Sequence, residues 1–301
     1  MLPVKKIYID SKNRTADSAS STNFKIDLVE SLTMPEDCVF QVADVIVPHT
    51  WYLISNARDH NLYLREYRDL VVENNSVTRN HVLEIPEGNY TGESLASAIQ
   101  QAFKKIEGDP QDSSKTIYKY TVNWDPVQES IQIIPDASAN GIQSNGNYNG
   151  FEILTDATRG FPSVITQLND LLGNFGASVK HSRTDLGQPG LEVTPIVDNW
   201  YISKRIDFLR IKFVYIKSPN LGTFKTLGSF GERTIIKKVP VTAPQGELII
   251  DDTRSGFDIL DCSRQTLRKL EFLLTDERGN ELDLHTHDVS FSLIFSLHTK
   301  E

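Results

Sequence analysis

Apolar and polar residues alternate along much of both ends of the chain, the pattern of β-strands that bury one face. The alternation is clearest at residues 24–28 and 289–297. Two long segments rich in β-branched residues, 39–47 and 205–216, predict longer strands, the second of them continuous or broken by a bulge. Further short strands are predicted at 5–10, 61–66, 70–73, 82–85, 234–241, 247–250, 270–275 and 281–284.

The middle of the chain has a different pattern. Thr91 is a predicted N-cap, Gly108 a predicted end, and between them apolar residues recur at helical spacing: Leu95, Ile99, Ala102, Phe103 and Ile106. A hairpin is expected at 118–134 and a second short helix from Pro162 to Gly173.

These elements predict a mainly β protein with two domains. Residues 80–176 form an inserted small α+β domain, and residues 1–79 and 177–301 together form a discontinuous domain. Many short strands split around one insertion favour a single antiparallel jelly-roll sandwich.

Composition narrows the class of protein. The 301 residues are 39% hydrophobic and 24% charged, a globular balance. No stretch approaches the roughly 20 apolar residues of a membrane-spanning helix, so no membrane insertion is expected. No apolar run follows Lys5 and Lys6, so no secretory signal is predicted.

The charge argues against a protein that wraps nucleic acid. The formal net charge is −9, and lysines and arginines are scattered, with isolated pairs at Lys104–Lys105, Lys237–Lys238 and Arg268–Lys269. Because tight binding requires a basic face that neutralises phosphates, tight nucleic-acid binding is not expected.

The chain has two cysteines, Cys38 and Cys262, far apart in sequence. A disulfide framework or a cysteine zinc site cannot be built from two such residues. The prediction is two buried free thiols in a reducing compartment.

Candidate catalytic and binding residues are few. His285 and His287 would share one face of a strand and suit a divalent metal, but an exposed loop is the favoured interpretation because a turn lies close by. Asp251–Asp252 and Asp276–Glu277 resemble paired glycosidase carboxylates, although acidic residues are common in turns.

Several aromatic residues could form a carbohydrate platform, but packing in the core or between domains is the favoured role. They are Trp51, Tyr52, Trp124, Trp200 and Tyr201. Nucleotide-binding, metalloprotease and nucleophile-elbow motifs do not occur in the sequence. We therefore predict no catalytic residue, no cofactor and no metal, and expect a protein that is not an enzyme.

Four segments in this order resemble the penton (minor capsid) proteins of virophages and polinton-like double-stranded DNA viruses. They are 7–28, with its serine-rich gap, 45–52, 85–91 with the helix and hairpin that follow, and 270–284 with the last strand. Each alone is a common strand–turn pattern, so the resemblance lies in their combination.

The resemblance implies a structural virion protein located at the capsid vertex. It implies a single upright jelly roll, five copies at each vertex of an icosahedral capsid, and neighbouring major capsid protein trimers. It also implies an inserted domain that faces outward and is the candidate surface for a host receptor. The alternatives are another virion attachment or fibre-like protein, trimeric rather than pentameric, and a carbohydrate-binding or glycoside-cleaving jelly roll.

The polar segment 11–22 has two interpretations. It is either an arm that orders only against a neighbouring copy or a plain surface loop.

Overall fold

A computed structural model forms two compact units, Met1–Trp51 with Ile211–Glu301, and Tyr52–Arg210. We call them unit 1 and unit 2 and describe each by itself. The structure describes residues 5–55, 60–70, 75–108, 112, 114–116, 119–135, 149–154, 168, 171–172, 179–181, 201–221, 226–228, 231–253 and 258–297.

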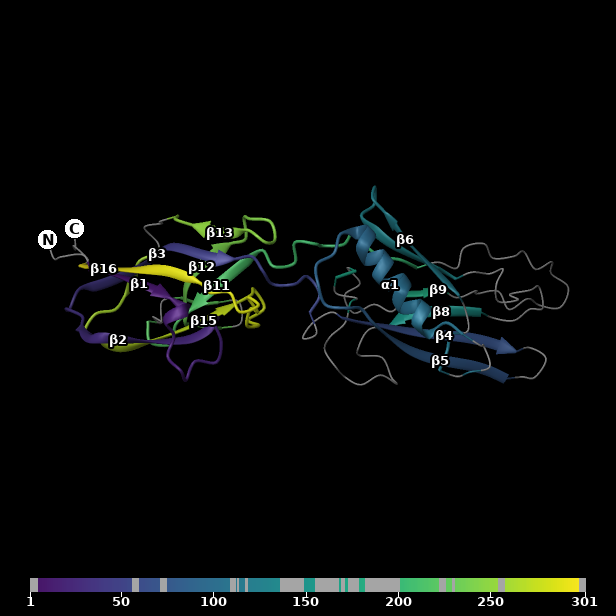
Figure 1. Cartoon of the computed structure of the whole chain (residues 1–301), viewed down its shortest axis with the longest axis horizontal. Coiled ribbons are helices and arrows are strands. Elements are labelled where there is room, and N and C mark those ends of the chain that lie inside the picture. Colours follow the sequence, from purple (N-terminus) through teal and green to yellow (C-terminus); the bar gives the residue numbers. More distant parts are fainter. Residues whose placement is uncertain are drawn as a thin grey trace. The chain divides into compact units, whose positions relative to one another are not determined.

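Unit 1 contains two antiparallel sheets (Figure 1). The strands of the first follow the order β1 (Lys5–Asp10), β16 (Ser290–Leu297), β3 (Cys38–Pro48) and β13 (Leu248–Asp251), and the short β14 (Leu260–Asp261) also pairs with β3. The second has the order β12 (Ile235–Pro240), β11 (Phe213–Lys217), β15 (Thr266–Thr275) and β2 (Asn23–Thr33).

One hydrophobic core joins the inner faces of these two sheets, which makes unit 1 a β-sandwich. Phe272 of β15 packs edge-on against Phe291 of β16, with ring centroids 4.9 Å apart, and on its own sheet contacts Phe24 at 5.4 Å. Alternation in the sequence places these side chains inward, so the strand pattern directly specifies the core.

An ion pair joins the sheets at each edge. At one edge Lys237 of β12 lies 3.4 Å from Asp251 of β13, and both side chains are only 3% exposed. At the other edge Lys5 of β1 pairs with Glu30 of β2 at 2.9 Å, in solvent. Only the first pair is removed from water, so only it affects the stability of the sandwich strongly.

Unit 2 holds two further antiparallel sheets and the helix. The larger sheet has the order β5 (Asn75–Glu84), β4 (Asn61–Leu70), β8 (Asn149–Leu154) and β9 (Val179–His181). The smaller has the order β10 (Tyr201–Ile202), β7 (Ser130–Pro135) and β6 (Tyr120–Asp125). Helix α1 (Gly92–Ile106) packs on β6 with its buried face.

The start of α1 confirms the predicted cap. The Thr91 hydroxyl accepts the Ser94 N–H at 3.3 Å, and the Ser94 hydroxyl accepts the Thr91 N–H at 2.8 Å. Gly92 lies against the Trp124 ring, so closely that an added Cβ would come within 2.1 Å of it. The glycine is therefore required by packing. The second predicted helix, from Pro162 to Gly173, lies largely outside the described residues.

The observed units differ from the expected ranges of 1–79 with 177–301, and 80–176. Residues 61–84 belong to unit 2 because β4 pairs with both β5 and β8. Chain after position 176 also belongs there, because β9 pairs with β8 and β10 pairs with β7. The boundary between the two units is set by which strands pair, and the local sequence pattern does not show which strands pair.

Two predicted strands are corrected. The segment 205–216 is a strand only from Phe213, because Ile206 and Phe208 pack in the core of unit 2 before the chain enters unit 1. After the turn at 276–280, the predicted strand 281–284 is reduced to one bridge, Thr275 to Glu281. In both places apolar residues are buried without forming a ladder.

The polar segment 11–22 is an ordered loop packed on its own unit. It begins with the 3-10 helix η1 (Ser11–Asn13), where Ser11 is fully buried and its hydroxyl bonds Asp288 at 2.8 Å. At its far end the Thr22 hydroxyl donates to the Leu282 carbonyl at 2.8 Å. Of the two interpretations, the structure supports the loop.

Candidate functional site

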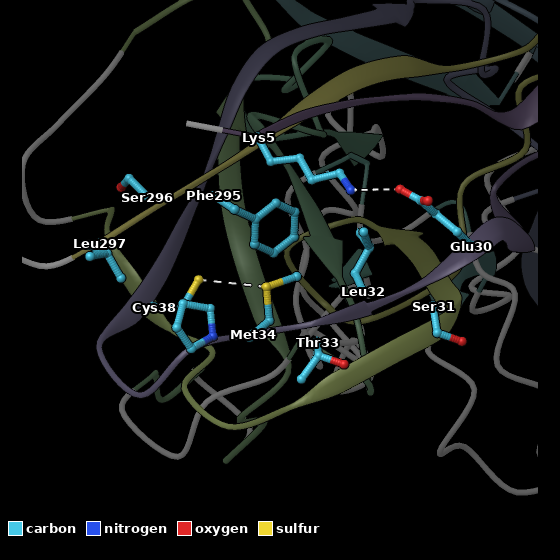
Figure 2. A pocket seen from close by; sticks show the side chains of 11 residues that line it. Lys5, Glu30, Ser31, Leu32, Thr33, Met34, Cys38, Phe295, Ser296 and Leu297 are labelled. Carbon is cyan, nitrogen blue, oxygen red and sulfur yellow. Dashed lines mark hydrogen bonds and ion pairs between the residues drawn. The ribbon is translucent and has the colours of Figure 1, made fainter. Parts of the chain in front are cut away.

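A pocket of about 300 Å³ opens in unit 1, between the end of β2, the start of β3 and the end of β16 (Figure 2). Its apolar lining comes from six residues: Leu32, Met34, Pro35, Cys38, Phe295 and Leu297. Its polar rim includes the Lys5–Glu30 ion pair. The pocket lies where β2 and β16 end, so paired strands no longer close this part of the sandwich.

Sulfur-containing side chains lie close together beside this pocket. The Cys38 thiol donates to Met34 Sδ at 3.6 Å, drawn as a dashed line in Figure 2. Cys262 lies next to Cys38, with its N–H bonded to the Cys38 carbonyl at 3.0 Å, and both cysteines are buried. Burial, with the Cys38 side chain beside it, raises the pKa of the Cys262 thiol. The predicted burial of both cysteines is confirmed. Although they are far apart in sequence, the two residues are neighbours in space.

Unit 2 buries a group of three titratable side chains that the sequence reasoning missed. Glu66 is fully buried; its Oε2 lies 3.1 Å from His81 Nε2, and its Oε1 accepts the Tyr120 hydroxyl at 2.9 Å. The signal was present, because Glu66 follows Leu62 and Leu64 at strand spacing on a buried face. The contacts satisfy both carboxylate oxygens, so the arrangement anchors β4 and β5 to β6.

The outer face of the first sheet carries exposed apolar residues near β13. Ile250 of β13 lies opposite Ile46 of β3 in the ladder, and their exposed fractions are 62% and 36%. Leu248 is 54% exposed and lies two residues before Ile250 on the same face. We call these three residues the β13 patch. Sequence reasoning placed a strand here but did not assign a role to its outward side chains.

His285 and His287 lie in a turn. His285 and Thr286 both have positive φ, 48° and 70°, so the strand alternation that would place the two imidazoles on one face is absent. His287 Nδ1 lies 3.0 Å from the Leu284 carbonyl, and His285 Nδ1 lies 3.5 Å from an Asp283 oxygen. Across the described part of the chain, no cluster of three or more His, Cys, Asp or Glu residues could hold a metal.

The candidate carboxylates are used by the fold. Asp251 pairs with Lys237 and accepts the Thr253 N–H at 3.0 Å. Asp276 is 2% exposed and binds its own turn, accepting the backbone N–H groups of Arg278 and Asn280 at 2.9 and 2.8 Å. Asp276 is therefore held by its own turn, whereas the second oxygen of Asp251 has only the Lys237 ammonium beside it. Of their neighbours in sequence, Asp252 is exposed and Glu277 is partly buried.

The aromatic residues do not form a common surface. Trp51 is buried in the core of unit 1 against the His49 ring at 4.3 Å. Tyr201 is fully buried in unit 2, and burial raises the pKa of its hydroxyl. Trp124 packs edge-on against Phe208 at 5.8 Å. Tyr52 is partly exposed, and Trp200 lies outside the described residues.

The chain is similar to known proteins in structure but not in sequence. No family model matches the sequence, and no curated protein matches it. Among solved structures, the chain is similar to the crystal structure of selenomethionine-labelled mavirus penton protein, with 10% sequence identity and a TM-score of 0.48. The match covers 99% of this chain and 100% of that chain.

The helix in the described residues does not meet the length and hydropathy that a membrane span requires.

Proposed function

We propose that this chain is a structural virion protein, a penton-type minor capsid protein that forms homopentamers at the vertices of an icosahedral double-stranded DNA virus. The observation that carries the proposal is the strand order of unit 1. In its described residues, nine strands form a five-stranded and a four-stranded sheet. Along the chain, successive strands of unit 1 alternate between the two sheets, except that β11 and β12 share one sheet and β13 and β14 share the other. We assign this order to a single jelly roll with its insertion between β3 and β11.

The sequence segments that resemble penton proteins support the same proposal. Residues 7–28 and 45–52 supply β1, β2 and the end of β3, and residues 270–284 supply the end of β15 and its turn. Apart from Tyr52, the first residue of unit 2, all three segments fall in unit 1, on both sides of the insertion. The fourth segment, 85–91, leads into α1 of the inserted unit.

A ring of identical chains requires two different surfaces that fit each other, because a head-to-tail contact joins unlike faces. The first sheet offers exposed apolar side chains near both of its ends: the β13 patch, and Tyr8 of β1, which is 77% exposed. We propose that the β13 patch of one copy packs against the β1 edge of the next. Apolar burial would supply cohesion between chains that each carry a net charge of −9.

The partners and location follow from the same proposal. Neighbouring major capsid protein trimers would surround the ring, and unit 2 is the candidate surface for a host receptor. The chain would be made and assembled in the host cell and would act without catalysis, cofactor or metal.

The mass of the purified chain in solution tests the proposal. Five chains of 33.9 kDa give a particle of about 170 kDa, and three would give about 100 kDa. A native mass spectrum and a negative-stain image with fivefold rings would support the penton assignment. A stable trimer would favour a fibre-like attachment protein. A chain that stays monomeric at every concentration would overturn the proposal that it assembles into a ring by itself.

Variants locate the contact. Ile250→Glu places a charge in the β13 patch and should dissociate the ring, because an unpaired charge buried at an interface costs several kcal/mol. Val127→Glu is the matched control, since Val127 is 91% exposed in the β6–β7 turn of unit 2. Equal ring stability in both variants would overturn the proposed surface.

A further inference from the structure

Cys38, the first residue of β3, and Cys262, the residue after β14, lie opposite each other. The antiparallel ladder of β14 on β3 pairs Asp261 with Val39, and the next pair in register is Cys262 with Cys38. The bond from the Cys262 N–H to the Cys38 carbonyl, 3.0 Å, shows that this register continues. Opposed residues project to the same face of a sheet, so the two thiols meet in the core of the sandwich.

This spacing suits a disulfide. Opposed residues on antiparallel strands have Cα atoms about 4.5–5.5 Å apart. Disulfides join Cα atoms about 4.4–6.8 Å apart, most often near 5.5–6 Å. The two cysteine side chains are also in contact with each other.

The pocket of Figure 2 gives small molecules a route to this pair. Cys38 is part of its lining, whereas Cys262 is not. At about 300 Å³ the pocket has room for several water-sized molecules. An oxidant of that size therefore meets the Cys38 sulfur first, and Met34 Sδ, 3.6 Å from it, is the competing target.

We propose that Cys38 and Cys262 are an oxidation site at which a small hydroperoxide, hydrogen peroxide in the simplest case, forms an intramolecular disulfide. The Cys38 sulfur attacks one peroxide oxygen, the O–O bond breaks, and a sulfenic acid and water result. The Cys262 sulfur then attacks the Cys38 sulfur and displaces a second water. In sum, two thiols and one hydrogen peroxide give one disulfide and two waters: sulfur is oxidised by two electrons and peroxide is reduced.

The bond would close a loop that contains every residue between the two cysteines, including all of unit 2. Cross-links that close such long loops restrict the unfolded chain strongly. The raised pKa of Cys262 keeps its thiol protonated at neutral pH, which makes the reaction slow. The site is a property of unit 1 and does not depend on ring formation.

The test is direct oxidation of the reduced full-length chain. After treatment with hydrogen peroxide, the intact mass should fall by two hydrogens, about 2 Da, with no change in oligomer mass. Free thiols counted in denaturant should fall from two to none. Peptide mapping should join the peptides of Cys38 and Cys262, and the melting temperature should rise by about 5–15 °C. Dithiothreitol should reverse all of these changes.

Three variants separate the steps. Cys262→Ser should stop at the sulfenic acid, gaining one oxygen, about 16 Da, and becoming reactive to dimedone. Cys38→Ser should leave Cys262 unmodified, because Cys262 does not line the pocket. Met34→Leu removes the competing sulfur and should still lose about 2 Da.

Several results would overturn the inference. Oxidation of Met34 while both thiols survive would show that peroxide enters but the pair does not bridge. Disulfide-linked dimers without the internal bond would show that the cysteines react between chains and not with each other. The wild-type mass and thiol count decide these cases even if a variant fails to fold.

Discussion

The buried Lys237–Asp251 pair allows a quantitative test of how the sandwich is stabilised. Lys237→Met removes the ammonium and leaves the Asp251 carboxylate, 3% exposed, without its partner. Breaking a buried pair in this way costs about 3–5 kcal/mol. Asp251→Asn should lower the free energy of unfolding by less, about 1–3 kcal/mol. In this variant the Lys237 ammonium still donates to the Thr253 carbonyl at 2.8 Å and still pairs with Asp258 at 3.5 Å.

The double variant distinguishes a buried charge pair from ordinary packing by whether the second substitution raises or lowers the free energy of unfolding. In Lys237→Met/Asp251→Asn neither residue is charged, and the amide oxygen can still accept the Thr253 N–H. Adding Asp251→Asn to Lys237→Met should therefore restore stability, although each change alone reduces it.

Urea unfolding followed by Trp51 fluorescence measures this, because Trp51 is buried in the core of unit 1. The other two tryptophans are first replaced by phenylalanine so that unit 2 does not contribute. With an m value of about 2 kcal/mol/M, Lys237→Met should lower the urea midpoint by about 1.5–2.5 M. A loss below about 1 kcal/mol, or a double variant less stable than Lys237→Met, would refute the reasoning.

Three further predictions concern single sites. Glu66→Gln should destabilise unit 2 by about 1–3 kcal/mol in urea unfolding, because it weakens buried bonds to the neighbouring imidazole and phenol. Gly92→Ala should destabilise unit 2 by about 1–3 kcal/mol and shift Trp124 emission, because its Cβ would meet the indole ring. NMR titration should place the Asp44 pKa at about 2, lowered first by Lys6 and then by Ser292. Since the folded pKa is below the unfolded one, this stabilisation is complete above about pH 4 and is lost as pH falls toward 2; Asp44→Asn should flatten stability in that window.

Matched controls accompany these variants. Glu84→Gln changes an exposed carboxylate on the same hairpin as Glu66 and should have little effect. Glu93→Ala changes the residue after Gly92, which is exposed, and should leave Trp124 emission unchanged. If either control matched its partner variant, the assigned contact would not be the cause.

Local signals in the sequence predicted the regular elements well. Thr91 and the apolar spacing after it located α1, and the strict alternation at 24–28 and 289–297 located β2 and β16. These features depend on residues that are at most three or four positions apart, so the local sequence is enough to predict them.

Features that depend on distant partners were harder to predict. The hairpin of β4 and β5 looks like the strands of unit 1 but belongs with β8, about 80 residues later. Cys38 and Cys262 looked unrelated because their contact is made by pairing between β3 and β14. The β13 patch is visible only once the outer face of the sheet is known.

The pairing of unit 1 has a consequence for synthesis on the ribosome. Among the described strands, β1, β2 and β3 pair only with β13–β16, all of which begin at or after Leu248. At about 5–20 residues per second, roughly 10–40 s separate translation of β3 from that of its first partner. During that interval unit 2 can complete its own sheets, while three nascent strands have unpaired backbone groups that can join those of other chains. Yield should therefore depend on translation speed and on chaperones that bind extended segments.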